Sequence, residues 1–266
     1  MDLSFLTHTW WGALIIIVVA GHFTIMCTSL YLHRSLTHGS VTFSPIAAFP
    51  MRVWLWLFTG MSAKQWVAVH RKHHAFVDTP QDPHSPVIHG WAAILFGGVM
   101  YYRKAYGDET TVKEYAKGWK DDFFEKYIFV PLKYGGPVIL YFIVAQIFGY
   151  LPGLLVWTGL VLWVPFWAAG VVNGLGHTIG YRNFQVEDAS TNIVPLGILL
   201  SGEELHNNHH KLPSSAKFSV KWYEFDMGWF YISILRFLHL QPGSCEKYNL
   251  YVIPHIVFSA LAEKTM

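Results

Sequence analysis

The sequence predicts an all-α integral membrane protein that folds as a single domain over residues 1–266 and holds a histidine-rich di-metal site. Three observations support this prediction. Apolar residues make up 53% of the chain and charged residues only 14%, whereas soluble domains carry about 25% charge. Several apolar runs are long enough to meet a bilayer. Fifteen histidines are present, and most of them fall in short clusters.

The apolar runs predict the membrane topology. Residues 10–32 approach the roughly twenty residues that a spanning helix requires, so this run is expected to cross once. Residues 135–150 and 153–175 are expected to cross and return as a hairpin. If the histidine clusters share one face, residues 45–61 and 87–102 cannot cross singly, and we expect them to be interfacial or re-entrant. Three spanning helices result, with four as the alternative.

Loop charges predict which side the histidines face. Residues 1–9 and the neighbourhood of Leu151 contain no Lys or Arg. The histidine side carries Arg34, Arg71, Lys72, Arg103, Lys104, Lys113, Lys117 and Lys120. By the positive-inside rule this side is cytoplasmic. We therefore expect residues 176–266 to form a helical cap in the cytosol, with a bacterial inner membrane as the location. The net charge of +2 gives no reason to expect a nucleic-acid partner.

Three histidine clusters predict metal binding. They are HRSLTH with His33 and His38, HRKHH with His70, His73 and His74, and HNNHH with His206, His209 and His210. On a helix, positions i, i+3 and i+4 fall within about 100° of one another, so each HxxHH triplet should direct three rings at one place. Eight imidazoles exceed what one ion accepts, which predicts more than one metal. Asn173 and His177 lie four residues apart and are further candidates. The alternative is that the histidines belong to the core or the surface.

At these residues the chain resembles the membrane fatty-acyl desaturases, which include stearoyl-CoA desaturases and bacterial delta-9 acyl desaturases. HxxxxH, HxxHH and HxxHH occur in that order, and Asp82-Pro83-His84, the Asn173 to His177 step, GEELHNNHH and WYEFD also match. The resemblance covers roughly residues 10–235. The family has two spanning helices before its first histidine box, whereas 32 residues precede His33, so the first helix of that pair is expected to be missing.

The resemblance implies a site of two iron ions. Its ligands would be His33, His38, His70, His73, His74, His177, His206, His209 and His210, with Asn173 reaching one iron through water. The implied reaction removes two adjacent hydrogens from a long saturated fatty-acyl chain, as acyl-CoA or acyl-lipid, and leaves a cis double bond while O2 is reduced to water. An unactivated methylene has no acidic proton and no polarised carbonyl, so a redox metal is needed. Zinc found after isolation would be a substitute for iron.

Groups around the ligands can also be predicted. Histidine ligands need partners for their other ring nitrogen. The candidates are Asp82, Glu203, Asp78 and His84, whereas Glu204, Asp188 and Asp226 are expected to be solvated or to cap helices. For a substrate phosphate or head group the candidates are Lys64, Arg71, Lys72 and Arg103, although marking the cytoplasmic side explains them equally well.

The electron source and the rival functions complete the prediction. The chain has no HPGG haem motif and too few cysteines for an iron–sulfur cluster, so a separate ferredoxin-like or cytochrome b5-like donor is expected. A di-iron membrane hydroxylase or a fatty-acid decarboxylase would use a similar site. A histidine-rich metal transporter or receptor would require polar groups deep in the spans, and residues 135–175 offer only Gln146, Thr158 and Asn173.

Overall fold

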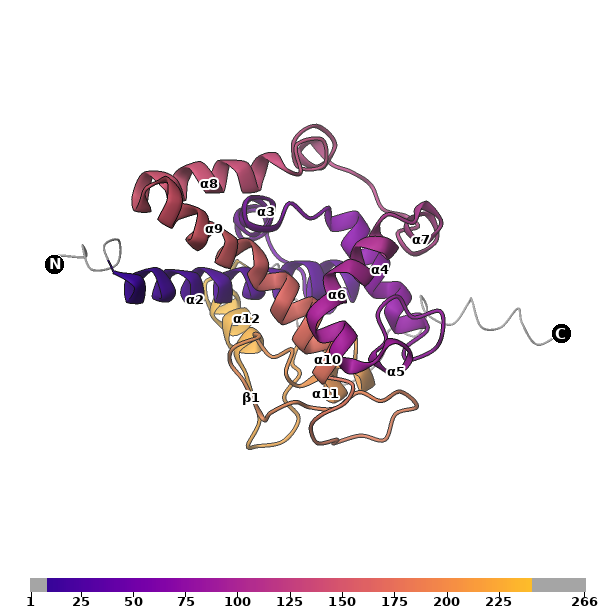
Figure 1. Cartoon of the computed structure of the whole chain (residues 1–266). Coiled ribbons are helices and arrows are strands. Elements are labelled where there is room, and N and C mark those ends of the chain that lie inside the picture. The colour runs from indigo at the N-terminus through magenta and orange to yellow at the C-terminus, as the bar shows by residue number, and fades with distance from the viewer. Residues whose placement is uncertain (1–8, 241–266) are drawn as a thin grey trace.

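The computed structural model describes residues 9–240, and two long helices organise it (Figure 1). The first consists of α2 (Trp10–Cys27) and the π-helix η1 (Thr28–Thr37). The second consists of α9 (Tyr150–Val164), the π-helix η3 (Pro165–Val172) and α10 (Asn173–Leu175). These continuous helices of 28 and 26 residues are apolar and long enough to cross a membrane. They contain the predicted spans 10–32 and 153–175.

The third predicted span is shorter than expected. Helix α8 (Gly135–Phe148) has 14 residues and forms a hairpin with α9, which Figure 1 shows at one side of the molecule. A rise of 1.5 Å per residue gives it about 21 Å, less than the hydrocarbon core of about 30 Å. Two helices therefore meet the length requirement among the described residues. The crossing of residues 135–150 stays a prediction.

The runs 45–61 and 87–102 form helices that pack against the long ones. Helix α3 (Pro45–Thr59) packs on α2 and α8, and α6 (Trp91–Tyr106) packs along η3. Contact between α6 and η3 requires a glycine, because a Cβ atom at Gly98 would lie 2.3 Å from the Ala169 carbonyl oxygen. The interfacial or re-entrant position of residues 45–61 and 87–102 stays a prediction.

Arg52, the only charged residue of α3, is paired. Its guanidinium donates to both carboxylate oxygens of Asp122, at 2.6 and 2.8 Å, and to Glu125 at 3.3 Å. These contacts hold α3 against the segment that contains the π-helix η2 (Glu125–Phe129). The charge is therefore neutralised by neighbouring carboxylates wherever the helix lies relative to the bilayer.

Shorter elements complete the fold around the histidines. Between α3 and η2 lie α4 (Ala63–Ala75), α5 (Pro86–His89) and α7 (Glu109–Tyr115). After α10 come β1 (Leu196–Gly197), α11 (His206–Lys211), β2 (Phe225–Asp226) and α12 (Met227–Phe237), with β1 and β2 paired in parallel. Within residues 176–240 only α11 and α12 are helical, so this part of the predicted cap is less helical than expected. Residues 241–266 of that cap lie outside the described residues.

Apolar packing fixes α12 and α4 beside η1. Leu30, Val67 and Ile232 are fully buried in one cluster that joins these three helices. A polar contact adds to it, because a ring nitrogen of His22 in α2 lies 2.8 Å from the Tyr231 hydroxyl in α12. Two of the elements that carry histidine clusters, η1 and α4, are therefore held to each other by the core.

Candidate metal centre

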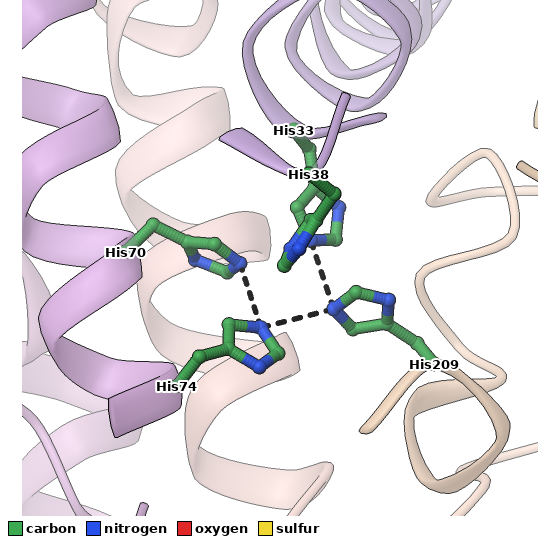
Figure 2. A group of neighbouring side chains, drawn as sticks. All are labelled: His33, His38, His70, His74 and His209. Carbon is green, nitrogen blue, oxygen red and sulfur yellow. Dashed lines mark hydrogen bonds between the residues drawn. The ribbon is translucent and has the colours of Figure 1, made fainter. Parts of the chain in front are cut away.

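The nine histidines that the sequence singled out lie in two adjacent groups. Group A consists of His33, His38, His70, His74 and His209, and group B consists of His73, His177, His206 and His210. Within each group the candidate ligand atoms all lie within 4.8 Å of one another. Figure 2 shows the rings of group A converging from η1, α4 and α11. Segments far apart in the sequence thus place imidazoles around two common centres.

The expectation that each HxxHH triplet points at one place is wrong. In α4, His70 and His74 belong to group A and His73 to group B; in α11, His206 and His210 belong to group B and His209 to group A. The physical reason is helical geometry, since i and i+4 differ by about 40° around the axis whereas i+3 and i+4 differ by about 100°. Each of the two helices consequently contributes a pair to one group and a single ring to the other.

The first cluster depends on a π-helix. The spacing of five in HRSLTH does not place two rings on one face of an α-helix. In η1 the amide of His38 donates to the carbonyl of His33 at 3.2 Å, which is the i→i+5 bond of a π-helix. The two ring centroids lie 4.8 Å apart. The wider turn therefore brings both imidazoles to group A, an arrangement that the sequence analysis did not foresee.

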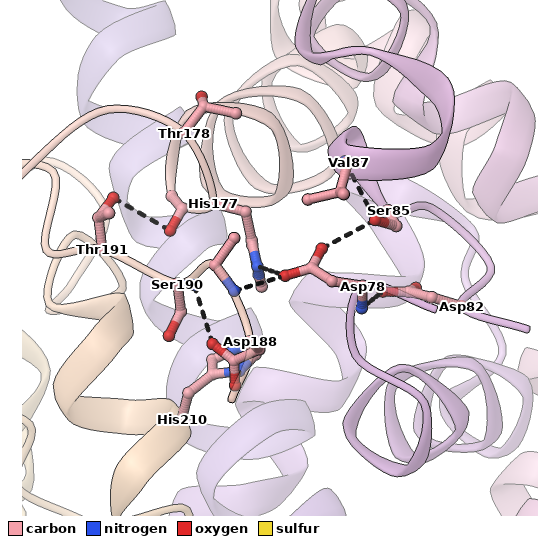
Figure 3. Close-up of polar contacts among 12 residues, drawn as sticks. Asp78, Asp82, Ser85, Val87, His177, Thr178, Asp188, Ser190, Thr191 and His210 are labelled. Carbon is pink, nitrogen blue, oxygen red and sulfur yellow. Dashed lines mark hydrogen bonds and ion pairs between the residues drawn. The ribbon is translucent and has the colours of Figure 1, made fainter. Parts of the chain in front are cut away.

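Four of the histidines donate their Nδ1 proton to a carboxylate. The pairs are His33 with Glu203 (2.8 Å), His73 with Asp82 (3.0 Å), His177 with Asp78 (2.9 Å) and His210 with Asp188 (3.3 Å), and the last two appear in Figure 3. Glu203, Asp82 and Asp78 therefore lie where the sequence analysis expected them. Asp188 was expected to be solvated or to cap a helix, and no spacing in the sequence pointed to its contact with His210.

The nitrogens that face each other in group B carry more lone pairs than hydrogens. In the neutral tautomer whose Nδ1 donates to Asp78 or Asp188, Nε2 of His177 and of His210 is a bare lone pair. These atoms lie 3.1 and 3.0 Å from Nε2 of His206, which can donate to only one of them. The donor set therefore fits a metal ion.

The protonation states favour ligation. Burial, followed by the charges of neighbouring histidines, lowers the pKa well below its ordinary value for His38, His70, His74, His206, His209 and His210. Burial also opposes charge on His73, but the Asp82 carboxylate more than offsets it and raises the pKa of His73. The six rings with lowered pKa are available as neutral ligands, while the Asp82 carboxylate favours positive charge at His73. A bound metal cation is compatible with both observations.

Two asparagines hold α11 in place. Asn207 and Asn208, which separate the histidines of HNNHH, are fully buried. The Asn207 side chain accepts from the amides of Asn183 and Phe184, and the Asn208 amide group donates to Glu224 at 2.9 Å. A helix of six residues is not stable alone, so these bonds position its three imidazoles.

A cavity of about 280 Å3 adjoins both groups. Its wall is mostly apolar and includes Ile25, Val164, Val172 and Leu200, while His33, His70, His206, His84 and Asn173 also line it. His84 was expected to support a ligand. Its ring stacks on His73 at 4.7 Å between centroids, and neither ring nitrogen has a partner among the described residues. The Asn173 side chain makes one long bond, to the Ala169 carbonyl at 3.4 Å.

The candidate head-group cations differ in their contacts. Arg71 donates to the carbonyls of Leu36 and Tyr115, at 3.0 and 3.3 Å, and Lys72 donates to the Thr111 hydroxyl at 2.9 Å. Both therefore tie α4 to neighbouring segments. Lys64 is half-buried in the first turn of α4. Arg103 lines the cavity together with Lys133, which the sequence analysis did not single out.

In the sequence, Arg34 is only one of the charges that mark the cytoplasmic side. The structure buries it completely beside His33. Its guanidinium donates to both oxygens of Asp226, at 3.0 and 3.2 Å, and lies 3.8 Å from the ring centroid of Phe218. Asp226 also caps α12 by accepting from the Trp229 amide, as expected. Arg34 thus clamps η1 to the segments around α11 and α12.

Comparison with known proteins decides the family. Residues 8–233, most of the chain, match the fatty acid desaturase family. The chain belongs to this family. It is 32% identical over 245 residues to "Acyl-CoA 5-desaturase AL21" of Anemone leveillei, covering 88% of this chain and 72% of that protein. It is 28% identical over 259 residues to "Delta-9 desaturase-like 4 protein" of Arabidopsis thaliana, covering 91% and 81%. It is 29% identical over 238 residues to "Delta-9 acyl-lipid desaturase 1" of the same plant, covering 86% and 71%.

Membership confirms the resemblance inferred from the histidine motifs and makes the chain an enzyme of the fatty-acyl desaturase type. With the two apolar helices, it also indicates a membrane protein. In this desaturase the two histidine groups are compatible with a metal site.

Proposed function

We propose that the chain is an oxygen-dependent di-iron desaturase that introduces a cis double bond into a long saturated fatty-acyl chain. One iron would bind at group A and the other at group B, and Asn173 would reach one of them through water. The observation that carries the proposal is the convergence of His177, His206 and His210 with more lone pairs than hydrogens. When bound, the irons supply the redox chemistry that oxidises an unactivated methylene.

The chain's own residues position the ligands and exclude water. The carboxylates of Asp78, Asp82, Asp188 and Glu203 hold Nδ1 of four rings protonated, which directs Nε2 at the metals. The apolar cavity admits an acyl chain beside His33, His70 and His206 and offers few groups that would bind water there. This apolar lining supports the proposal that the substrate has no polar groups near the reacting carbons.

The carrier and the partners follow from charge and from the relatives. Of the relatives described above, one acts by its name on acyl-CoA and another on acyl-lipid. Both acyl-CoA and an acyl-lipid that is a phospholipid carry phosphate. Arg103 and Lys133 at the cavity are the cations best placed to meet it. The two electrons come from a separate ferredoxin-like or cytochrome b5-like donor at the basic face, and the positive-inside rule supports a cytoplasmic location for that face. Since these relatives are from plants, the bacterial inner membrane stays a prediction.

Lipid analysis of a desaturase-deficient host tests this proposal. Cells expressing the chain should accumulate fatty acids two hydrogens lighter than their saturated precursors, measured by gas chromatography with mass detection. Cells expressing His74→Ala at the same membrane level should not. A product one oxygen heavier would instead indicate a hydroxylase, and a shortened hydrocarbon a decarboxylase. Absence of any lipid change together with metal uptake would favour the transporter.

A further inference from the structure

The carboxylates that support the histidines are distributed unequally between the groups. In group B, three of the four rings donate to a carboxylate, which belongs to Asp78, Asp82 or Asp188. In group A, one of the five rings does so, through Glu203. Figure 3 shows Asp78 and Asp188 close to the group B rings His177 and His210. The histidine pattern alone does not distinguish the two groups in this way.

Cations sharpen this difference. Glu203 lies 3.8 Å from the guanidinium of Arg34, so its charge is partly neutralised. Among the described residues, the carboxylates of Asp78, Asp82 and Asp188 form ion pairs with histidines alone. Arg182 reaches the Asp188 region, but it donates to the main-chain carbonyl of that residue. Group B therefore carries the greater uncompensated negative charge.

Charge of this kind changes the redox properties of a bound ion. A carboxylate that accepts the Nδ1 proton makes its histidine a stronger electron donor through Nε2. Negative charge near a metal also stabilises its more oxidised state, which lowers the reduction potential. Burial strengthens both effects because the local dielectric is low, and Asp82 is 3% exposed.

We propose that the two metal positions are electronically inequivalent, with the ion at group B having the lower reduction potential and the ion at group A the higher. Asp188 is then a positioning residue that acts on the metal through His210, and Glu203 is its counterpart acting through His33. The inference rests on the proposed function, since it requires iron at both groups. It adds the order in which the two ions are reduced: the ion at group A is reduced at the higher potential.

A redox titration of purified, 57Fe-loaded protein tests the order. Mössbauer spectra recorded during stepwise reduction should show two potentials separated by a gap. Asp188→Asn keeps an oxygen that accepts the His210 proton but removes the charge, so it should raise the lower potential and narrow the gap. Glu203→Gln should raise the higher potential and widen it. Asp122→Asn, which removes a carboxylate that pairs with Arg52, is the matched control and should leave the gap unchanged.

The outcomes separate the two proposals. Equal potentials in the wild-type protein, or widening of the gap by Asp188→Asn, would overturn the inference while iron at both positions upholds the proposed function. Failure of the wild-type protein to bind iron would count against the proposed function itself. If the Asp188→Asn variant loses iron, the Asp82→Asn variant is titrated in its place, because Asp82 supports His73 in the same group. A narrower gap between the two potentials in that variant supports the inference, and a wider gap overturns it.

Discussion

Replacing the buried Arg34 should destabilise the protein strongly. Arg34 and Asp226 have fully buried side chains, and the guanidinium donates to both carboxylate oxygens and to the Ser201 carbonyl at 3.1 Å. Arg34→Met leaves the Asp226 carboxylate buried without its cation. Breaking such a pair on one side costs about 3–5 kcal/mol. We expect a loss of that size in the free energy of unfolding, measured by denaturant titration in detergent with tryptophan fluorescence.

Two further variants separate the buried charge from other causes. In Arg34→Met with Asp226→Asn, the unpaired charge is removed while the asparagine oxygen can still accept from the Trp229 amide, so part of the stability should return. Asp122→Ala breaks the Arg52 pair, whose carboxylate is half exposed, and should cost about 1 kcal/mol or less. A loss below about 1 kcal/mol for Arg34→Met, equal to that of Asp122→Ala, would refute the reasoning.

Three more predictions concern the metals and the packing. His74→Ala or His209→Ala should abolish product and lower the iron content measured by mass spectrometry. The control His89→Ala, at an exposed residue, should change neither product nor iron content. Full activity of the His74 or His209 variant would reject that histidine as a ligand. Gly98→Ala should cost about 1–3 kcal/mol, because its methyl group would meet the main chain of η3, while Gly97→Ala has room and should cost little; equal losses in thermal unfolding would contradict the close approach. Adding ferrous iron to chelator-treated protein should raise its unfolding temperature with concentration, and an unchanged temperature would show that the histidine groups do not bind it.

The sequence predicted the parts of the fold that depend on local pattern. Long apolar runs predicted both long helices. The clusters pointed to eight histidines, the resemblance to the desaturases added His177, and Asp78, Asp82 and Glu203 were proposed as their supports; the structure brings these residues together. What it missed depends on contacts between distant segments. Asp188 approaches His210 only because the chain after α10 folds back over α11, and Arg34 meets Asp226 across 192 residues.

The lengths of the helices were predicted less well than their existence. The run 10–32 ends just before His33, and apolar composition alone gives no reason for the helix to continue through HRSLTH. The structure continues it to Thr37 as a π-helix, because the i→i+5 bonds place His33 and His38 together. A tertiary requirement at the candidate site therefore decided the local conformation.

Each HxxHH motif contributes rings to both histidine groups, which couples the geometry of one group to that of the other. Because α4 and α11 each contribute to both groups, their relative position fixes the separation of the two centres as well as the geometry of each. A rotation of α11 alone would disturb His209 in group A and His206 in group B together. The buried Asn208 opposes such a rotation through its bond to Glu224, so the polar network behind the histidines helps to hold the rings of both groups in position.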